Sequence, residues 1–329
     1  MKKILVFIFA IFFISITGNS QVADPQFTQF YSVPLYLAPS FAGATQQHRV
    51  SATYRNQWAG IPGNFNTYTV AYDHYFNKFN SGLGFLVVRD AAGSAKLGFT
   101  YFSVLYSYDF LVLKTFHVRP GISFIYNRIG IEFAKLVFGD QFGPDGVVAK
   151  SGVELPPSIE KRGNIDGNFS VLVYSEKFWQ GVTVDHLLKP NMSFYGDKEL
   201  KPVRYTFYGG TKLISKGRLL KPADESISLA YQMRFQGDYK QLDIGLYWYN
   251  SPLVLGIWYR GLPVINAPRG DALAFLAGLK IYDMSFAYSY DFTISNLINS
   301  SGGAHEVTLI YEFRTTHRKK YHAIPCPEF

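Results

Sequence analysis

The sequence predicts an all-β fold: a transmembrane antiparallel β-barrel of about 14 strands, with an N-terminal segment at its periplasmic mouth or inside it as a plug. Three observations lead to this prediction. Long stretches alternate between apolar and polar residues, which is the period of a strand. Charged residues make up 17% of the chain and hydrophobic residues 48%, whereas about a quarter of a soluble domain is charged. After the leader, no apolar run reaches the roughly 18 residues of a membrane-spanning helix.

The first element, residues 1–20, has the pattern of a cleaved signal peptide. Lys2 and Lys3 precede an apolar run over 4–16, and the small residues Gly18 and Ser20 stand before Gln21. The alternative, a buried N-terminal helix, does not explain these flanks. We therefore expect export, with cleavage near Ser20/Gln21. The single cysteine, Cys326, excludes a disulfide framework and an N-terminal lipid anchor, and its role stays open.

The second element, residues 21–46, is an extended segment that contains "DPQFTQFYSVPLYLAPSFAG" at 24–43. Its prolines favour extended backbone, and its aromatic side chains must pack against something. Two interpretations remain open. The segment fills the periplasmic mouth as a plug or docking surface, or it only fixes the first strand.

The third element, residues 47–314, is the barrel. In "ESISLAYQMRFQ" (225–236), Ile227, Leu229 and Tyr231 alternate with Ser228, Ala230 and other small or polar residues. Many runs reach ten residues or more, longer than the five or six of an average soluble strand. The predicted strands are 48–58, 66–76, 82–91, 96–109, 113–127, 166–175, 178–187, 202–214, 225–236, 239–250, 252–260, 271–281, 281–292 and 304–314.

The connections support this assignment. With both termini in the periplasm, long connections should lie outside and short turns in the periplasm. The irregular stretches 130–165, 188–201, 261–270 and 292–303 all follow odd-numbered strands, although 215–224 is long for a periplasmic turn. Pro120 cannot donate to a ladder and predicts a bulge. The third strand, "LGFLVV", could face either way.

The inward face should carry the charged residues of the strands. The predicted lumen-facing residues are Arg55, Asp73, Asp185, Arg234, Asp243, Asp283 and Glu306, together with His117, Arg119 and Arg204. Such mixed charges either pair across the polar interior or line a binding path, and both interpretations remain open.

The last element, residues 315–329, is a basic periplasmic tail that follows Arg314 and contains His317, Arg318, Lys319 and Lys320. It either docks an acidic partner or is simply solvated. The formal net charge of +8 is spread along the chain, which does not favour nucleic-acid binding.

Catalytic, cofactor and metal sites are not predicted. The pairs Asp73–His74 and Asp185–His186 are adjacent on strands, so their side chains should point to opposite faces. The histidines have no metal-ligand spacing, and no phosphate loop is present. We therefore expect no enzyme.

Four motifs, taken together, resemble one family. The opening segment matches its pattern at Asp24, Pro25, Phe27, Thr28, Gln29, Tyr31, Pro34, Leu35, Pro39, Ala42 and Gly43, while Ala38 and Ser40 replace its usual asparagine and alanine. "LVFGDQF" contains its Gly139, Asp140 and Gln141, and 171–191 and 288–313 are similar to its hairpins. "CPEF" at 326–329 is similar to its terminus. The chain thus resembles the PorP/SprF outer-membrane proteins of the type IX secretion system of Bacteroidetes.

The resemblance implies a component of the secretion and gliding machinery. It implies export or surface attachment of a dedicated large secreted protein with a C-terminal sorting domain, and contact with the periplasmic ring and motor. The matched motif residues would bind partners. The lumen-facing charges, if they line a binding path, would bind the secreted sorting domain. A passive transporter of hydrophobic small molecules and a barrel enzyme remain as alternatives.

Overall fold

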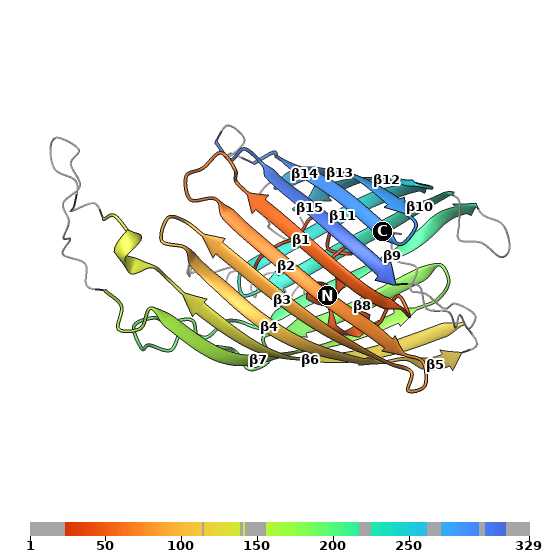
Figure 1. Ribbon diagram of the computed structural model, residues 1–329, viewed down its shortest axis with the longest axis horizontal. Coiled ribbons are helices and arrows are strands. Elements are labelled where there is room, and N and C mark those ends of the chain that lie inside the picture. The colour runs from red at the N-terminus through yellow and green to blue at the C-terminus, as the bar shows by residue number, and fades with distance from the viewer. Residues whose placement is uncertain are drawn as a thin grey trace, which may run out of the picture.

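The strands form a closed antiparallel barrel (Figure 1). The computed structural model describes residues 24–113, 115–138, 141, 156–216, 225–261, 271–295 and 300–313. Consecutive strands pair with each other except β4 and β5, β1 pairs with β15, and β4 pairs with β6, so the sheet closes. Closure gives backbone N–H and C=O groups partners within the sheet, which hydrocarbon demands.

The elements have the following bounds: α2 (Pro34–Leu37), η1 (Pro39–Phe41), β1 (His48–Gln57), β2 (Phe65–Phe76), β3 (Ser81–Ala92), β4 (Leu97–Tyr108), β5 (Phe110–Leu113), β6 (Phe116–Gly130), η2 (Phe133–Lys135), β7 (Lys161–Tyr174), β8 (Phe178–Asp185), β9 (Arg204–Lys216), β10 (Glu225–Gln236), β11 (Tyr239–Asn250), β12 (Leu253–Arg260), β13 (Ala272–Ile281), β14 (Met284–Thr293) and β15 (Ala304–Phe313).

The barrel has fourteen strand positions, as predicted. β4 and β5 share one position, because both pair with β6 and only Asp109 separates them. Most boundaries lie within three residues of the prediction. The main exception is β7, which begins at Lys161 rather than at 166 because it pairs with β6 as far as Gly130.

The bulge predicted at Pro120 was wrong in its position. β6 pairs with β7 without interruption from His117 to Gly130. The irregularity lies on the opposite neighbour, where β4 ends at Tyr108 and β5 shifts register between Leu111 and Leu113. Pro120 lies across from this break, where the neighbouring ladder does not need its missing N–H.

Alternation separates a lipid-facing surface from the lumen. On the outside, Val70 and Phe124 are 56% and 57% exposed, whereas on the inside Leu86 and Val88 of β3 are 2% and 0% exposed. This resolves the orientation of the third strand. The placement of Asp283 on the inward face was wrong, since it lies in the turn between β13 and β14. A residue in a turn no longer follows the inward–outward alternation of strand side chains.

The two ends of the barrel differ. Short connections join β2 to β3, β7 to β8, β11 to β12 and β13 to β14 at one end, and the connections β6–β7 and β8–β9 at the other end are long. Figure 1 shows the long-connection end, with η2, on the left. Among the described residues, no helix is long and apolar enough to cross a membrane.

Candidate functional site

Residues 24–47, called the plug below, lie inside the barrel. Asp24 contacts Arg204 at the start of β9, at the long-connection end. Gly43 contacts Asp73 near the end of β2, at the short-turn end. The plug therefore crosses the lumen from one end to the other, with Asp24 at the long-connection end and Gly43 at the short-turn end.

Proline shapes the plug locally. Pro34 and Pro39 stand at the first positions of α2 and η1, where a missing N–H costs nothing and the fixed φ favours a helical turn. These turns are short, so the plug remains irregular backbone. Such backbone is tolerated at membrane depth only when protein surrounds it. Accordingly Gln29, Ser32, Ala38 and Ala42 are all 0% exposed.

Aromatic side chains fix the plug against the wall. Phe30 meets Trp258 edge to face, with ring centroids 5.1 Å apart, and Tyr31 meets Tyr247 in the same way at 4.6 Å. Phe41 packs against Trp179 at 6.1 Å. Edge-to-face pairs add about 0.5–1.5 kcal/mol beyond burial. These aromatic residues of the plug thus form a core with the inner wall.

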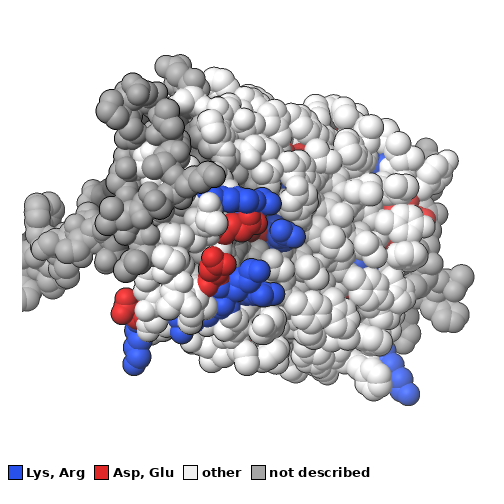
Figure 2. All heavy atoms as spheres, turned by 60° about the vertical axis from the view of Figure 1, so that its left-hand side comes forward, with Lys and Arg blue, Asp and Glu red and all other residues white. Residues whose placement is uncertain are grey.

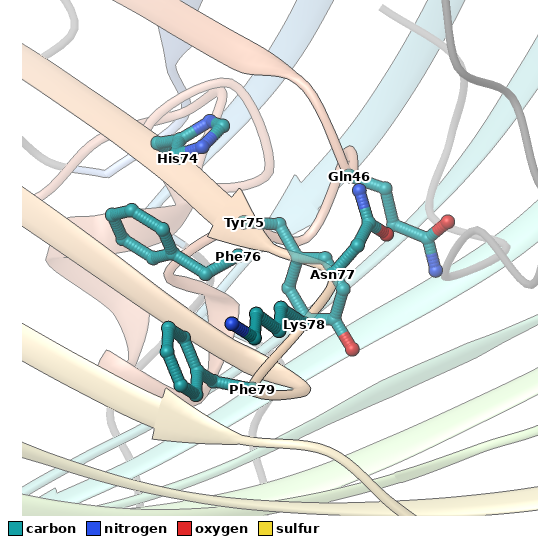
Figure 3. Close-up of a pocket in the computed structure, with 7 residues that line it drawn as sticks. All are labelled: Gln46, His74, Tyr75, Phe76, Asn77, Lys78 and Phe79. Atoms are coloured by element: carbon teal, nitrogen blue, oxygen red, sulfur yellow. The ribbon is translucent and has the colours of Figure 1, made fainter.

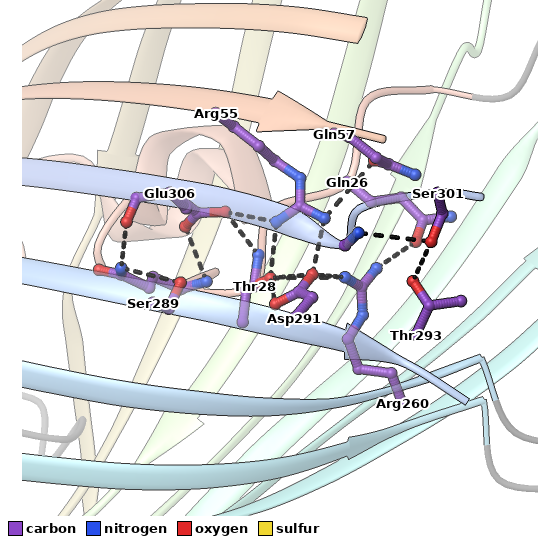
Figure 4. A network of polar contacts seen from close by, with 12 residues as sticks. Gln26, Thr28, Arg55, Gln57, Arg260, Ser289, Asp291, Thr293, Ser301 and Glu306 are labelled. Carbon is purple, nitrogen blue, oxygen red and sulfur yellow. Dashed lines mark hydrogen bonds and ion pairs between the residues drawn. The ribbon is translucent and has the colours of Figure 1, made fainter. Parts of the chain in front are cut away.

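A buried polar network holds the plug at Thr28 and Gln29 (Figure 4). The backbone N–H groups of both residues donate to Glu306, each at 2.9 Å. The Thr28 hydroxyl donates to Asp291 at 2.7 Å, and the amide of Gln29 donates to Ser289 at 3.1 Å. Glu306 therefore replaces the strand partners that this irregular backbone lacks.

Two arginines neutralise this network. Arg55 pairs with Glu306 at 3.0 Å and with Asp291 at 2.8 Å, and Arg260 also pairs with Asp291. Two cations thus face two carboxylates, with side-chain exposures between 0% and 5%. Buried charges persist only when paired and hydrogen-bonded. Arg260 also donates to Gln26 at 2.6 Å, so the network extends along the plug toward the long-connection end.

Asp24 forms a second network at the long-connection end. Its carboxylate accepts from Lys201, from His186 at 2.8 Å and from Arg204 at 3.0 Å. Burial alone would raise the pKa of Asp24, but Lys201, His186 and Arg204 together hold it well below the usual value of 3.8. Burial would lower the pKa of His186, yet Asp24 and Asp166 raise it above its usual value of 6.5.

The prediction that the side chains of Asp185 and His186 point to opposite faces was wrong. His186 lies just past the end of β8 with a φ of +61°, so the strand alternation no longer applies. Its two ring nitrogens contact Asp24 and Asp166, the latter at 2.6 Å. Asp185 joins the same network through Arg204, at 2.9 Å.

The base of the plug is fixed at the short-turn end. Gly43 N–H donates to Asp73 at 2.7 Å, and Arg49 pairs with Asp73 at 2.8 Å. The carbonyl of Ala42 accepts from Arg119 and from Ser107. The backbones approach closely here, since a Cβ added at Gly82 would lie 1.8 Å from the Ala42 oxygen. Glycine is required at that contact.

A shallow pocket of about 220 Å³ lies beside the base (Figure 3). It is lined by Gln46 of the plug and by 74–79 at the turn between β2 and β3. His74 stacks on His48, with ring centroids 3.8 Å apart. The pocket is open and has polar and apolar lining, and none of its lining residues belongs to the networks around Glu306 and Asp24.

Most predicted site residues lie in these networks. Of the predicted lumen-facing set, Arg55, Asp73, Asp185, Arg204, Glu306 and Arg119 contact the plug directly or through one residue. Arg234 contacts Gln26 at 3.4 Å and pairs with Asp243 at 2.9 Å. His117 pairs with Asp109 at 2.9 Å.

The opening family motif is part of the plug. Asp24, Thr28, Gln29 and Gly43 make polar contacts with the wall, and the remaining motif residues pack in the lumen: Pro25, Phe27, Tyr31, Pro34, Leu35, Pro39 and Ala42. Gly139 and Asp140 lie outside the described residues. The side chain of Gln141 accepts from Phe138 N–H at 2.7 Å within its own loop.

Several partners of the plug were not singled out from the sequence, among them Asp166, Lys201, Arg260 and Asp291. Asp166, Arg260 and Asp291 lie on inward positions of strands, so alternation combined with charge could have identified them. Lys201 lies in the β8–β9 connection, and its position depends on the tertiary fold. Among the described residues, no group of three or more His, Cys, Asp or Glu could hold a metal ion.

Comparison with protein families gives one match, to the "Type IX secretion system membrane protein PorP/SprF" family over residues 19–311. The chain belongs to the PorP/SprF family. It is thus a β-barrel membrane protein of the type IX secretion system, with the closed architecture of outer-membrane barrels. No curated protein matches this PorP/SprF chain.

Several solved barrels are similar to this PorP/SprF protein in structure. Omp33 of Acinetobacter baumannii is 9% identical with a TM-score of 0.44, and covers 82% of this chain and 98% of its own. The toluene transporter TodX of Pseudomonas putida is 8% identical with a TM-score of 0.48, covering 83% and 93%. A Pseudomonas aeruginosa FadL homologue is 11% identical with a TM-score of 0.45, covering 84% and 94%.

Proposed function

We propose that the protein is an outer-membrane component of the type IX secretion and gliding machinery. It assists export or surface attachment of one dedicated large secreted protein with a C-terminal sorting domain, and it contacts the periplasmic ring. The observation that carries the proposal is the family match over residues 19–311, on a barrel whose lumen is filled by residues 24–47.

The filled lumen favours docking over conduction. An α-helix with its side chains is about 10–12 Å wide. The plug fills the lumen through which such a helix would have to pass, and aromatic contacts and buried ion pairs hold it there. Breaking one buried pair costs about 3–5 kcal/mol, and the plug is held by Glu306 at one level and Asp73 at another. Passage of a polypeptide would break several such contacts together. The secreted protein therefore crosses elsewhere, and this barrel retains or presents it.

The two ends suit two partners. The long-connection end faces the cell exterior and offers the larger surface to the secreted protein. The short-turn end faces the periplasm and lies beside the ring. Signal cleavage before Gln21 and a periplasmic C-terminal tail complete this arrangement.

Quantitative proteomics of the cell surface and medium tests the proposal. Deletion of the gene should remove one large protein with a C-terminal sorting domain, while other proteins with such domains remain. A variant lacking 24–43 should lose the same protein while the barrel still shows heat-modifiable migration on gels. An unchanged secretome in the gene deletion would overturn the proposal. If only the 24–43 variant secretes normally, the plug has no role in it.

A pull-down in mild detergent tests the partners. The tagged protein should bring down the same large secreted protein and a component of the periplasmic ring. Reconstituted liposomes test the competing transport hypothesis, since selective uptake of a hydrophobic small molecule would favour a transporter instead.

A further inference from the structure

The carboxylate of Asp24 is held as a bound ligand would be. Four donors converge on it: His186 at 2.8 Å, Arg204 at 3.0 Å, Gln236 at 3.2 Å and Lys201. They come from the β8–β9 connection, from the start of β9 and from the end of β10. Donors from separate wall elements thus form a preassembled pocket around a single acidic group of the plug.

The pocket lies at an accessible end and adjoins free space. Figure 2 shows the long-connection end, where acidic and basic side chains gather in one region of a largely uncharged surface. A cavity of about 50 Å³ lies beside the Asp24 carboxylate, between the plug and the wall residues Leu86, Leu105 and Ile125. The carboxylate therefore has room on one side, and its side chain is 10% exposed.

Removal of Asp24 would leave the pocket with an unmet charge. Arg204 would still pair with Asp185, and His186 would still pair with Asp166. Lys201 is different, because within the described part of the chain Asp24 is its only ion-pair partner and its side chain is 7% exposed. A buried ammonium without a counter-charge is strongly unfavourable. The vacated pocket would therefore bind another carboxylate.

Exchange at this position is separable from the rest of the plug. After Asp24, the next polar contacts of the plug with the wall are those of Gln26 with Tyr239, Arg260 and Arg234. Thr28 and Gly43 are held independently by Glu306 and Asp73. Release of Asp24 thus frees the first residues of the plug, Asp24 and Pro25, while the rest of the plug stays in the lumen.

We propose that His186, Lys201, Arg204 and Gln236 form a carboxylate-binding site that Asp24 fills from within and that an acidic residue of a partner polypeptide fills in exchange. The site accepts a side-chain or terminal carboxylate on an extended peptide. The inference rests on the proposed function only for the source of that peptide, an acidic segment of the secreted protein at the outer end of the barrel.

Peptide binding to the full mature protein in detergent tests the site. The probe is an N-dansylated, C-amidated Asp-Pro-Gln-Phe-Thr peptide, in which the aspartate is the only carboxylate, and its control carries Asn in place of Asp. In wild type, the internal Asp24 competes at high effective concentration. The Asp24→Ala variant should bind the Asp peptide on the order of 100-fold more tightly than wild type, and it should bind the Asn peptide weakly.

Matched variants sharpen the result. Adding Lys201→Met to Asp24→Ala should weaken peptide binding at least tenfold, by roughly the value of a charged hydrogen bond. Asp197→Ala, which removes an exposed acid from the same connection, should bind as wild type does. Heat-modifiable migration reports whether each barrel is folded. If Asp24→Ala does not fold, Asp24→Asn retains the shape and replaces it.

Two outcomes would overturn the proposal: equal affinity of wild type and Asp24→Ala for the Asp peptide, or equal affinity of the variant for the Asp and Asn peptides. Acetate separates the sources of the carboxylate. If acetate binds the variant as tightly as the peptide does, the site takes small free carboxylates and the peptide assignment is wrong. No secreted protein enters this assay, so its failure is distinguishable from failure of the secretion experiments.

Discussion

Glu306 is the residue whose loss should most directly loosen the middle of the plug. Its carboxylate, 0% exposed, accepts the backbone N–H groups of Thr28 and Gln29 at 2.9 Å each and pairs with Arg55 at 3.0 Å. Glu306→Ala removes all three contacts and leaves a buried guanidinium with one carboxylate fewer. Breaking a buried pair costs about 3–5 kcal/mol, so about 4 kcal/mol is a fair expectation for local opening.

Amide hydrogen exchange measures this opening directly. Each 1.36 kcal/mol corresponds to about a tenfold change, so the amides of Thr28 and Gln29 should exchange on the order of 1,000-fold faster in Glu306→Ala. Glu306→Gln keeps the shape of the side chain and one acceptor oxygen, so the free energy of local opening should fall by only about 2 kcal/mol. Hydrogen exchange of the same two amides should then be roughly 30-fold faster than in wild type. Strand amides of the barrel should change little, because local openings have their own free energies.

Glu312→Ala is the matched control. Glu312 lies on the same strand and is only partly buried, and within the described part of the chain its side chain makes no hydrogen bond or ion pair with the plug. That variant should leave the exchange of Thr28 and Gln29 unaltered. The reasoning fails if Glu306→Ala forms a heat-modifiable barrel and both amides remain as protected as in wild type, because the glutamate would then not hold the plug.

Three further predictions concern the ends of the plug. Gly82→Ala places a Cβ 1.8 Å from the Ala42 oxygen, which should lower the free energy of unfolding in urea by about 1–3 kcal/mol. Gly130→Ala, whose Cβ meets the flexible Lys161 side chain at 3.3 Å and the Glu160 oxygen at an ordinary 3.6 Å, should be nearly neutral, and equal losses in the two variants would contradict this. The Asp24–His186 contact should be strongest between about pH 3.8 and 6.5: the Asp24 contribution is lost as pH falls through its lowered pKa, and that of His186 as pH rises through its raised pKa. NMR should place the His186 titration midpoint above 6.5, and Asp24→Asn should lower it; an unmoved midpoint counts against the contact. Arg119→Met removes a charged donor from the Ala42 carbonyl and should speed exchange of the Gly43 amide by roughly 10- to 100-fold, a result that Arg119→Lys should partly restore.

Most of the barrel could be predicted from the sequence. The twofold alternation is a local property, because successive side chains of a strand point to opposite faces whatever their neighbours are. It therefore predicted fourteen strands, their approximate ends, and an inward position for residues such as Arg55 and Glu306. It failed where the chain leaves a strand, as at Asp283 in its turn and at His186 with its positive φ, because turns end the alternation.

The tertiary structure alone decided which charges meet. Asp24 and Lys201, or Thr28 and Glu306, are separated by most of the chain, and no local pattern encodes their distance. Closure of the barrel brings β1 beside β15 and so places Arg55 against Glu306. The sequence by itself determined which residues face the lumen, since that depends on parity, whereas the pairing of plug and wall depends on ring closure, which is a property of the whole chain.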